Sequence, residues 1–166
     1  EFEPESGDLR LQYASILRKK QKFEKTMEQV NILCSQFPDN QNYQAQKASE
    51  VMQNGDHEAA IKILEEIQKK NPYNFSVLTS KGHAQKTLGK TKEAISSYQS
   101  AYQIKPDHGE AFFSLANLKT YKFSDAELTN MRQQVERIDL SLREKVYFHF
   151  ALAQGYEAGG RHEEAF

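Results

Sequence analysis

Three prolines at a constant spacing divide most of this chain into units of equal length. Pro38, Pro72 and Pro106 lie 34 residues apart, and each follows a segment of helical pattern. Proline ends a helix because it cannot donate a backbone hydrogen bond and clashes with the preceding turn. Gly55 and Gly89, also 34 residues apart, lie midway between prolines, and glycine readily adopts the left-handed conformation that closes a helix. Each unit is therefore predicted to be a helix, a glycine turn, a second helix and a proline turn.

A 34-residue unit of two helices resembles the tetratricopeptide repeat. That family has small residues at the eighth and twentieth positions of the repeat, where its two helices approach closely. The second unit has Ala48 and Ala60 at these positions, and the third has Gly82 and Ala94. The resemblance implies an all-α fold, a right-handed superhelical α-solenoid of antiparallel helix pairs. Such pairs stack because one pair alone cannot bury its apolar stripe.

The predicted array covers residues 7–166 and follows an N-terminal tail or cloning remnant at residues 1–6. The turn of the first unit lacks glycine and reads Lys20-Gln21-Lys22-Phe23. The turn of the fourth has Phe123-Ser124-Asp125 instead of glycine, and Ser124 or Asp125 can cap the next helix. The fifth unit starts about three residues late, which predicts an insertion near residues 139–141. Because the last helical pattern runs to Phe166, we expect the chain to be a piece of a longer protein. The predicted repeats are 7–40, 41–74, 75–108, an irregular 109–145 and a truncated 146–166.

Composition and charge give no sign of a nucleic-acid or membrane partner. The formal net charge is −1, from 22 Lys and Arg against 23 Asp and Glu, so the chain lacks the basic excess that binds polyanions. No apolar run approaches the roughly 18 residues that span a bilayer, and no signal peptide opens the chain. We therefore expect neither nucleic-acid binding nor membrane insertion, and a cytoplasmic location.

No catalytic, cofactor or metal site is predicted. Five histidines are present, but no two stand four apart on one predicted helix, so the zinc-ligand spacing is missing. Cys34 is the single cysteine, without a neighbouring histidine, and is expected to be a buried structural thiol. The glycines at 155, 159 and 160 lack the strand and the lysine of a phosphate loop. The chain as given is not expected to be an enzyme.

The binding surface is expected on the first helix of each repeat. In the tetratricopeptide family these helices line a concave groove that holds an extended protein segment or peptide. The positions that point inward are polar in the early repeats and aromatic in the later ones, although Phe113 and Phe150 could also serve only to pack neighbouring helices. The predicted peptide-binding residues are Asn42, Ser49, Gln53, Thr79, His83, Lys86, Phe113, Asn117, Tyr121 and Tyr147.

The fourth and fifth units carry a more specific resemblance. The segments Leu115-Ala116-Asn117-Leu118-Lys119-Thr120 and Phe150-Ala151-Leu152 are similar to runs in bacterial sulfotransferases that carry an N-terminal tetratricopeptide array, while Ala153-Gln154-Gly155 departs from their pattern. The resemblance covers residues 111–166. It implies that the parent protein uses the sulfated nucleotide PAPS and that its catalytic domain lies beyond Phe166.

Three functional hypotheses remain open on the sequence alone. The chain is a protein-binding scaffold that serves as the docking region of a sulfotransferase, a stand-alone tetratricopeptide adaptor, or a self-associating assembly scaffold with no enzyme attached. The partner in each case is a protein or peptide. The oligomeric state is left open.

Overall fold

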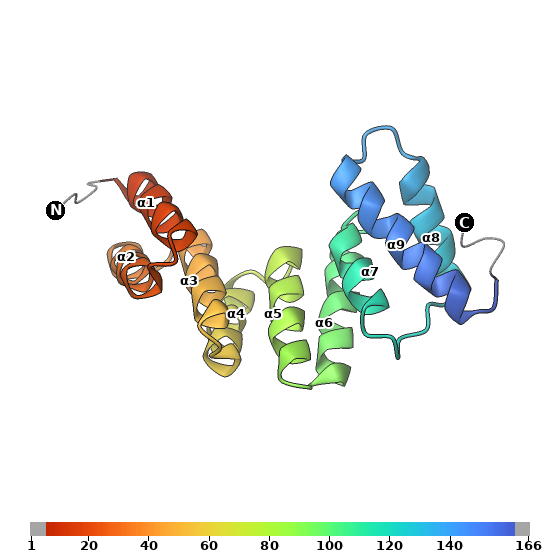
Figure 1. The fold of residues 1–166 in the computed structure, drawn as a ribbon, viewed down its shortest axis with the longest axis horizontal. Coiled ribbons are helices and arrows are strands. Elements are labelled where there is room, and N and C mark those ends of the chain that lie inside the picture. The colour runs from red at the N-terminus through yellow and green to blue at the C-terminus, as the bar shows by residue number, and fades with distance from the viewer. Residues whose placement is uncertain (1–5, 162–166) are drawn as a thin grey trace. The chain divides into compact units, whose positions relative to one another are not determined.

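The computed structural model describes residues 6–161, which form helices and connecting turns without any strand (Figure 1). The all-α class predicted from the repeat is therefore confirmed. The helices are α1 (Gly7–Lys19), α2 (Phe23–Gln36), α3 (Gln41–Gln53), α4 (His57–Lys70), α5 (Phe75–Thr87), α6 (Thr91–Ile104), α7 (Gly109–Ala116), α8 (Asp125–Glu136) and α9 (Leu142–Ala158).

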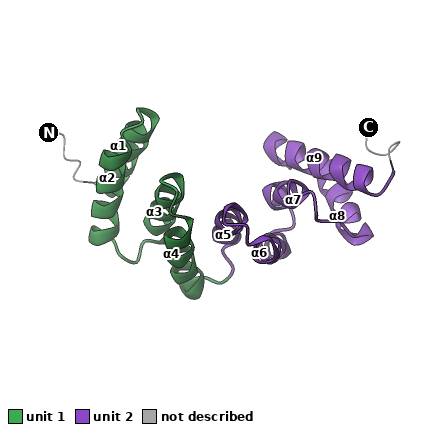
Figure 2. Cartoon of the chain, turned by 60° about the horizontal axis from the view of Figure 1, so that its bottom comes forward, with its two compact units in different colours: residues 1–72 green, residues 73–166 purple. Residues whose placement is uncertain are grey.

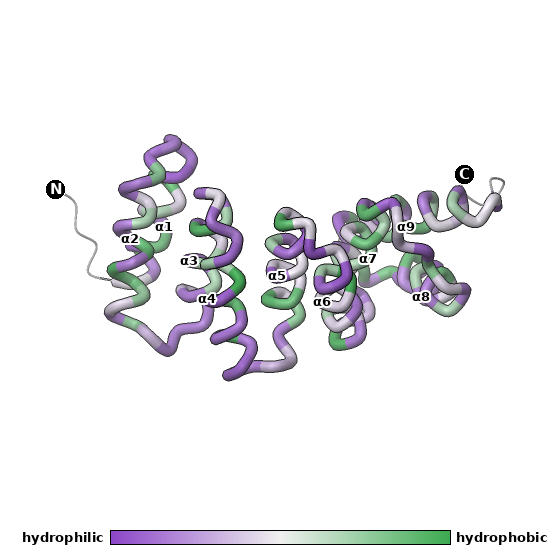
Figure 3. The backbone as a smooth tube through the Cα atoms, turned by 90° about the horizontal axis from the view of Figure 1, so that it is seen from below, coloured by the Kyte–Doolittle hydropathy of each residue, from purple (hydrophilic) through white to green (hydrophobic). Residues whose placement is uncertain are grey.

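Two compact units make up the chain, residues 1–72 and residues 73–166, and the boundary falls in the turn between α4 and α5 (Figure 2). Along the helices, hydrophobic and hydrophilic residues alternate in short patches (Figure 3), as expected for helices with one buried stripe. No described helix is both long and apolar enough to cross a membrane.

Asparagine, aspartate and serine side chains start many of the helices. Asn40 and Asn74, which follow the proline turns, accept hydrogen bonds from the first-turn N–H groups of α3 and α5. Asp56 caps α4 in the same way. Ser124 forms a complete capping box with Glu127 at the start of α8, which confirms the cap predicted there. These caps provide hydrogen-bond acceptors for first-turn N–H groups, which have no acceptor within the helix.

The turn inside each helix pair has one recurrent geometry. Gln21, Gly55, Gly89 and Gly160 have positive φ angles between 57° and 89°. In each turn, the N–H of this residue bonds to the carbonyl three residues earlier and the next N–H bonds five residues back. This is the pattern that closes a helix with a left-handed residue. Gln21 thus adopts the conformation that glycine has in the other three turns.

Unit 1 contains two helix pairs that pack in chain order, α1 on α2, α2 on α3 and α3 on α4. Ala14, Val30 and Leu33 are buried together in its core with Cys34 and Tyr43. The Cys34 thiol lies 3.4 Å from the Tyr43 carbonyl, and burial raises its pKa. This confirms the prediction of a buried structural thiol.

Unit 2 begins with a regular pair and ends irregularly. α5 packs on α6, and Gly82 lies directly against the ring of Tyr98. α7 has only 8 residues, and among the described helices it packs mainly against α9 and α6, with a smaller contact to α5, rather than against its expected partner α8. α9 also packs on α8, so these three helices share one core. That core contains Phe112, Ala116, Leu128, Met131, Leu140, Phe148, Ala151, Leu152 and Tyr156.

Candidate functional site

The first helices of the pairs in unit 2, α5 and α7, and the following α9 bring polar and aromatic side chains together. α7 contacts both α5 and α9, so residues of the three helices meet along α7. The residues concerned, called the A-helix surface below, are His83, Glu110, Phe113, Tyr147 and Phe150. None of them is fully buried.

Its polar end is a hydrogen-bonded chain centred on His83 of α5. One ring nitrogen, Nδ1, lies 3.0 Å from the Tyr98 hydroxyl, and the other, Nε2, lies 3.4 Å from Oε1 of Glu110. A carboxylate can only accept, so Nε2–H is the donor to Glu110. This hydrogen bond lowers the pKa of the Glu110 carboxyl, although burial opposes the shift. The Tyr98 phenol is buried and its pKa is raised strongly, so it stays protonated.

A second histidine, His108, is buried close to this hydrogen-bonded group. His108 is 7% exposed, and its Nε2 lies 2.9 Å from the hydroxyl of Thr79. Thr79 already donates its one hydroxyl hydrogen to the Phe75 carbonyl at 2.9 Å. Nε2 of His108 must therefore donate to Thr79, so this nitrogen carries a hydrogen. The ring is either the neutral Nε2–H tautomer or the doubly protonated cation. Burial lowers the pKa of His108, and the neutral form is favoured.

The other end of the A-helix surface is aromatic. The ring of Phe113 lies 5.0 Å from Tyr147 and 4.7 Å from Phe150, measured between ring centroids. Arg143 donates to the Tyr147 hydroxyl at 3.1–3.2 Å and covers its ring at 5.4 Å. These distances are those of favourable aromatic and cation–π contacts. The edge of this cluster at Phe150 is 38% exposed.

A close contact between α7 and α9 sets the position of these aromatic rings. The N–H of Gly109 donates to Oε2 of Glu144, so a carboxylate lies at the positive end of α7. A Cβ at Gly109 would lie 2.9 Å from the Glu144 carbonyl oxygen and 3.0 Å from Cβ of Tyr147. Glycine at this position therefore allows the two helices to approach.

Beyond the aromatic cluster, α9 presents a second apolar stripe to solvent. Leu142, Val146 and Phe150 stand four residues apart and are 79%, 58% and 38% exposed. Residues at this spacing share one face of a helix. The opposite face of α9 carries the buried Phe148, Ala151 and Leu152. Within the part of unit 2 that the structure describes, α9 is therefore apolar on two faces. One face is buried, and the other is exposed apart from the contact of Phe150 with Phe113.

Comparison with known proteins identifies this architecture. A tetratricopeptide-repeat family profile matches residues 75–108, the α5–α6 pair with its turns. Among solved structures, the MamA RS-1 ArsTM double mutant has a TM-score of 0.66 and 16% identity, covering 98% of this chain and 89% of that one. MamA AMB-1 has a TM-score of 0.57 and 23% identity, covering 97% and 73%. The fold is that of a tetratricopeptide-repeat protein.

At these identities, the likeness to MamA establishes the fold and nothing further. MamA MSR-1 is similar in the same way, with a TM-score of 0.54 at 22% identity over 97% of this chain and 71% of that one. No curated protein sequence matches the chain.

The structure brings together only part of the binding surface predicted from the tetratricopeptide register. His83, Phe113 and Tyr147 belong to the A-helix surface, and Thr79 lies beneath it against His108. Asn117 donates its side-chain amide to the Phe113 carbonyl at 3.0 Å, and Lys86 is exposed near the end of α5. Asn42, Ser49 and Gln53 lie on α3 in the other unit.

Tyr121 lies on a different side of unit 2. Its hydroxyl donates to Oε1 of Glu127 and accepts from Gln99, in contact with α6 and α8. Tyr102 donates to the same carboxylate oxygen at 2.8 Å. Burial disfavours ionised Glu127, but hydrogen bonds from Tyr121, Ser124 and Tyr102 outweigh it and lower its pKa. Burial and this carboxylate raise the pKa of Tyr121 to about 12.

Sequence reasoning missed three residues that support the A-helix surface: His108 beside Thr79, Arg143 on Tyr147 and Glu144 at the start of α7. His108 lies 29 residues after Thr79 and follows the Pro106 turn, so its contact depends on stacking of successive repeats. Arg143 and Glu144 are in the first turn of α9, which begins at Leu142, four residues before the repeat boundary expected at residue 146. Ser141 before this turn, with Glu144 three residues later, was an available signal for that earlier helix start.

Proposed function

We propose that the chain is a protein-interaction scaffold and that the A-helix surface of unit 2 binds a segment of a partner protein. The exposed stripe Leu142, Val146 and Phe150 carries this proposal. An apolar stripe next to an aromatic cluster and rimmed by charged residues is typical of an interaction surface. The tetratricopeptide fold supports the proposal, because its stacked first helices present such side chains side by side.

The charges around this surface favour a partner segment with both apolar and polar groups. Phe113, Tyr147 and Phe150 offer aromatic area, and aromatic residues supply much of the contact energy at interfaces. Glu110 and His83 at the other end are 32% and 40% exposed and can hydrogen-bond a peptide backbone.

A selection of random peptides displayed on phage against the whole chain tests the proposal. Val146→Glu places a charge in the stripe at a residue that is 58% exposed, so the fold should be kept. Ile16→Glu, on α1 of unit 1 at 51% exposure, is the matched control. We expect a group of the selected peptides to lose at least ten-fold in affinity with Val146→Glu and to bind Ile16→Glu as they bind the unchanged chain. If every selected peptide binds both variants equally, the surface is rejected.

We also propose, from sequence resemblance, that the parent protein is a PAPS-dependent sulfotransferase and that this scaffold docks its substrate. The support is the similarity of residues 115–120 and 150–152 to such enzymes; the comparisons with known proteins add none. The residues in question also have structural roles, since Leu115, Ala116, Ala151 and Leu152 are core side chains. Sequencing the gene downstream of Phe166 tests the idea, and the absence of a phosphosulfate-binding loop there would refute it.

A further inference from the structure

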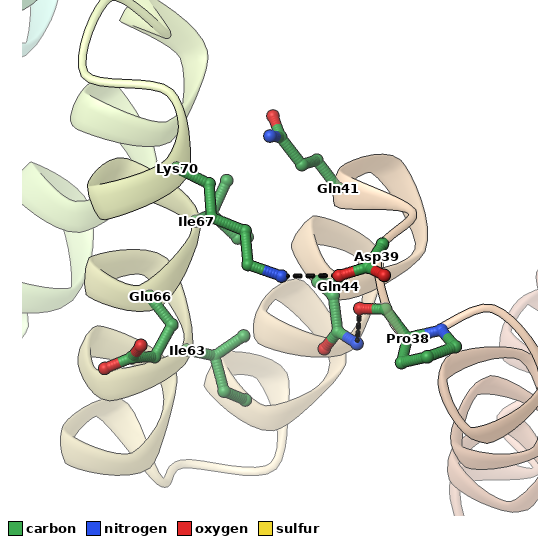
Figure 4. A pocket seen from close by; sticks show the side chains of 8 residues that line it. All are labelled: Pro38, Asp39, Gln41, Gln44, Ile63, Glu66, Ile67 and Lys70. Carbon is green, nitrogen blue, oxygen red and sulfur yellow. Dashed lines mark hydrogen bonds and ion pairs between the residues drawn. The ribbon is translucent and has the colours of Figure 1, made fainter.

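A pocket in unit 1 opens between α4 and the turn that leads into α3 (Figure 4). Its volume is about 260 Å³. Ile63 and Ile67 of α4 supply apolar lining, and Ile67 is only 3% exposed. The remaining lining residues are Pro38, Asp39, Gln41, Gln44, Glu66 and Lys70.

Polar side chains form the rim of this pocket. Lys70 Nζ pairs with Oδ1 of Asp39 at 2.7 Å, and the Gln44 amide donates to the Pro38 carbonyl at 3.2 Å (Figure 4). Asp39 and Lys70 are 90% and 56% exposed. Exposed ion pairs are weak, so this pair can separate when a ligand arrives.

Comparison with the next repeat shows why the space is empty. Thirty-four residues further on, Gln44 is replaced by Leu78 and Gln41 by Phe75, while Lys70 is replaced by Ile104. In that repeat Leu78, Phe75 and Ile104 pack together in one apolar cluster. The second repeat has polar side chains at all three positions. Its larger Ile63 and Ile67, in place of Ser97 and Ala101, still leave the pocket open.

We propose that this pocket binds one apolar side chain of a partner protein, in the place that Leu78 and Phe75 fill in the following repeat. An apolar floor within a polar rim is the arrangement that holds the anchor residue of an interface. The rim offers two carboxylates, Asp39 and Glu66, and the ammonium group of Lys70. These groups can accept from the N–H groups and donate to the carbonyl groups of a peptide backbone. The site lies in unit 1 and is separate from the A-helix surface of unit 2.

Substituting the next repeat's residue into the pocket tests this proposal on the whole chain. Gln44→Leu places apolar atoms where the partner's side chain would lie, and it should leave the fold intact or raise the melting temperature. Gln12→Leu, at an exposed position of α1, makes the same chemical change away from the pocket. Random phage-displayed peptides are selected on the unchanged chain and depleted on Gln44→Leu.

We expect the remaining peptides to share an apolar residue, to shift the methyl resonances of Ile63 and Ile67, and to bind Gln44→Leu at least ten-fold more weakly than Gln12→Leu. The proposal is overturned if no peptide survives the depletion, or if the survivors leave both isoleucine methyl groups unshifted. Val146→Glu should not affect these peptides. The pocket and the A-helix surface can therefore fail or succeed independently.

Discussion

Replacing Gly82 by alanine should destabilise unit 2, because the added methyl group would overlap the ring of Tyr98. A Cβ at this position would lie 2.5, 2.7 and 2.9 Å from three carbons of that ring, whereas ordinary contacts begin near 3.4 Å. Tyr98 is fully buried and its hydroxyl is bonded to His83 at 3.0 Å. The ring therefore has little room to move away.

The size of the effect follows from two opposing contributions. Overpacking a core by one methyl group costs about 1–3 kcal/mol, and the short contacts place this change near the upper value. Alanine in the interior of a helix is favoured over glycine by about 1 kcal/mol. We expect a net loss of about 2 kcal/mol in the free energy of unfolding, measured by urea denaturation with circular dichroism and tyrosine fluorescence, since the chain has no tryptophan.

The neighbouring repeats provide the control. The equivalent pairs, 34 and 68 residues earlier, are Ala48 with Leu64 and Ala14 with Val30, all of them buried. In the background Tyr98→Leu, which matches the second repeat, Gly82→Ala should be neutral or stabilising because the ring is gone. If Gly82→Ala costs the same in both backgrounds, the overlap with Tyr98 is not its cause.

Three further predictions concern the turns, a buried histidine and a buried ion pair. Gln21→Gly should stabilise unit 1 by about 0.5–1 kcal/mol, because Gln21 has a φ of 57°, and Gly89→Gln should destabilise unit 2, both measured by thermal melting. Melting temperatures that shift in the same direction in both variants would contradict the shared turn geometry. Burial lowers the pKa of His108 in the folded state despite Glu144 and Glu110 nearby, so the free energy of unfolding should fall as the pH drops below the unfolded pKa of about 6.5. His108→Gln should remove this loss of stability between pH 7 and 5, whereas the loss caused by protonation of Glu110 begins only below about pH 4.5. An unchanged pH profile in His108→Gln would refute this. Glu50→Gln should lower the free energy of unfolding by about 1–3 kcal/mol in urea denaturation, because Glu50 is 3% exposed and paired with Arg18. Glu66→Gln, at an exposed pair with Lys69, should lower it by almost nothing. Similar losses in both variants would show that burial of the pair does not matter.

The regular part of the fold was predictable because its signals are local and periodic. Pro38, Pro72, Gly55 and Gly89 mark turns, and the helices after the prolines begin at Gln41 and Phe75, where the 34-residue spacing predicts them. The conformation of Gln21 was less evident, since residues other than glycine rarely adopt it. Its position 34 residues before Gly55 was the available signal.

The irregular part was not predictable because long-range packing decides it. α7 ends at Ala116, and Lys119 adopts a φ of 56°, although the apolar pattern continues to Leu118. Phe123 then packs against Phe112, with ring centroids 6.4 Å apart. Tyr121 follows this loop toward Glu127 and away from the surface on which the repeat register predicted it.

The candidate site was predicted in its residue types more than in its contacts. The repeat register placed His83, Phe113 and Tyr147 on three different helices, and they lie on α5, α7 and α9. It could not show that His83 bridges Tyr98 and Glu110, because these residues lie on two further helices. The pocket at Ile63 and Ile67 was likewise not predictable. The sequence shows polar residues where the next repeat has apolar ones, but it does not show which of these differences leaves a pocket.

The most direct test of the interaction scaffold is to map where a peptide selected on the whole chain binds to unit 2. Hydrogen–deuterium exchange of the chain with and without the peptide provides this map. For a peptide whose binding is sensitive to Val146→Glu, we predict slowed exchange in α7 (Gly109–Ala116) and α9 (Leu142–Ala158). Slowing confined to α6 (Thr91–Ile104) and α8 (Asp125–Glu136) would contradict the account, because it would place the partner on the second helices of the pairs.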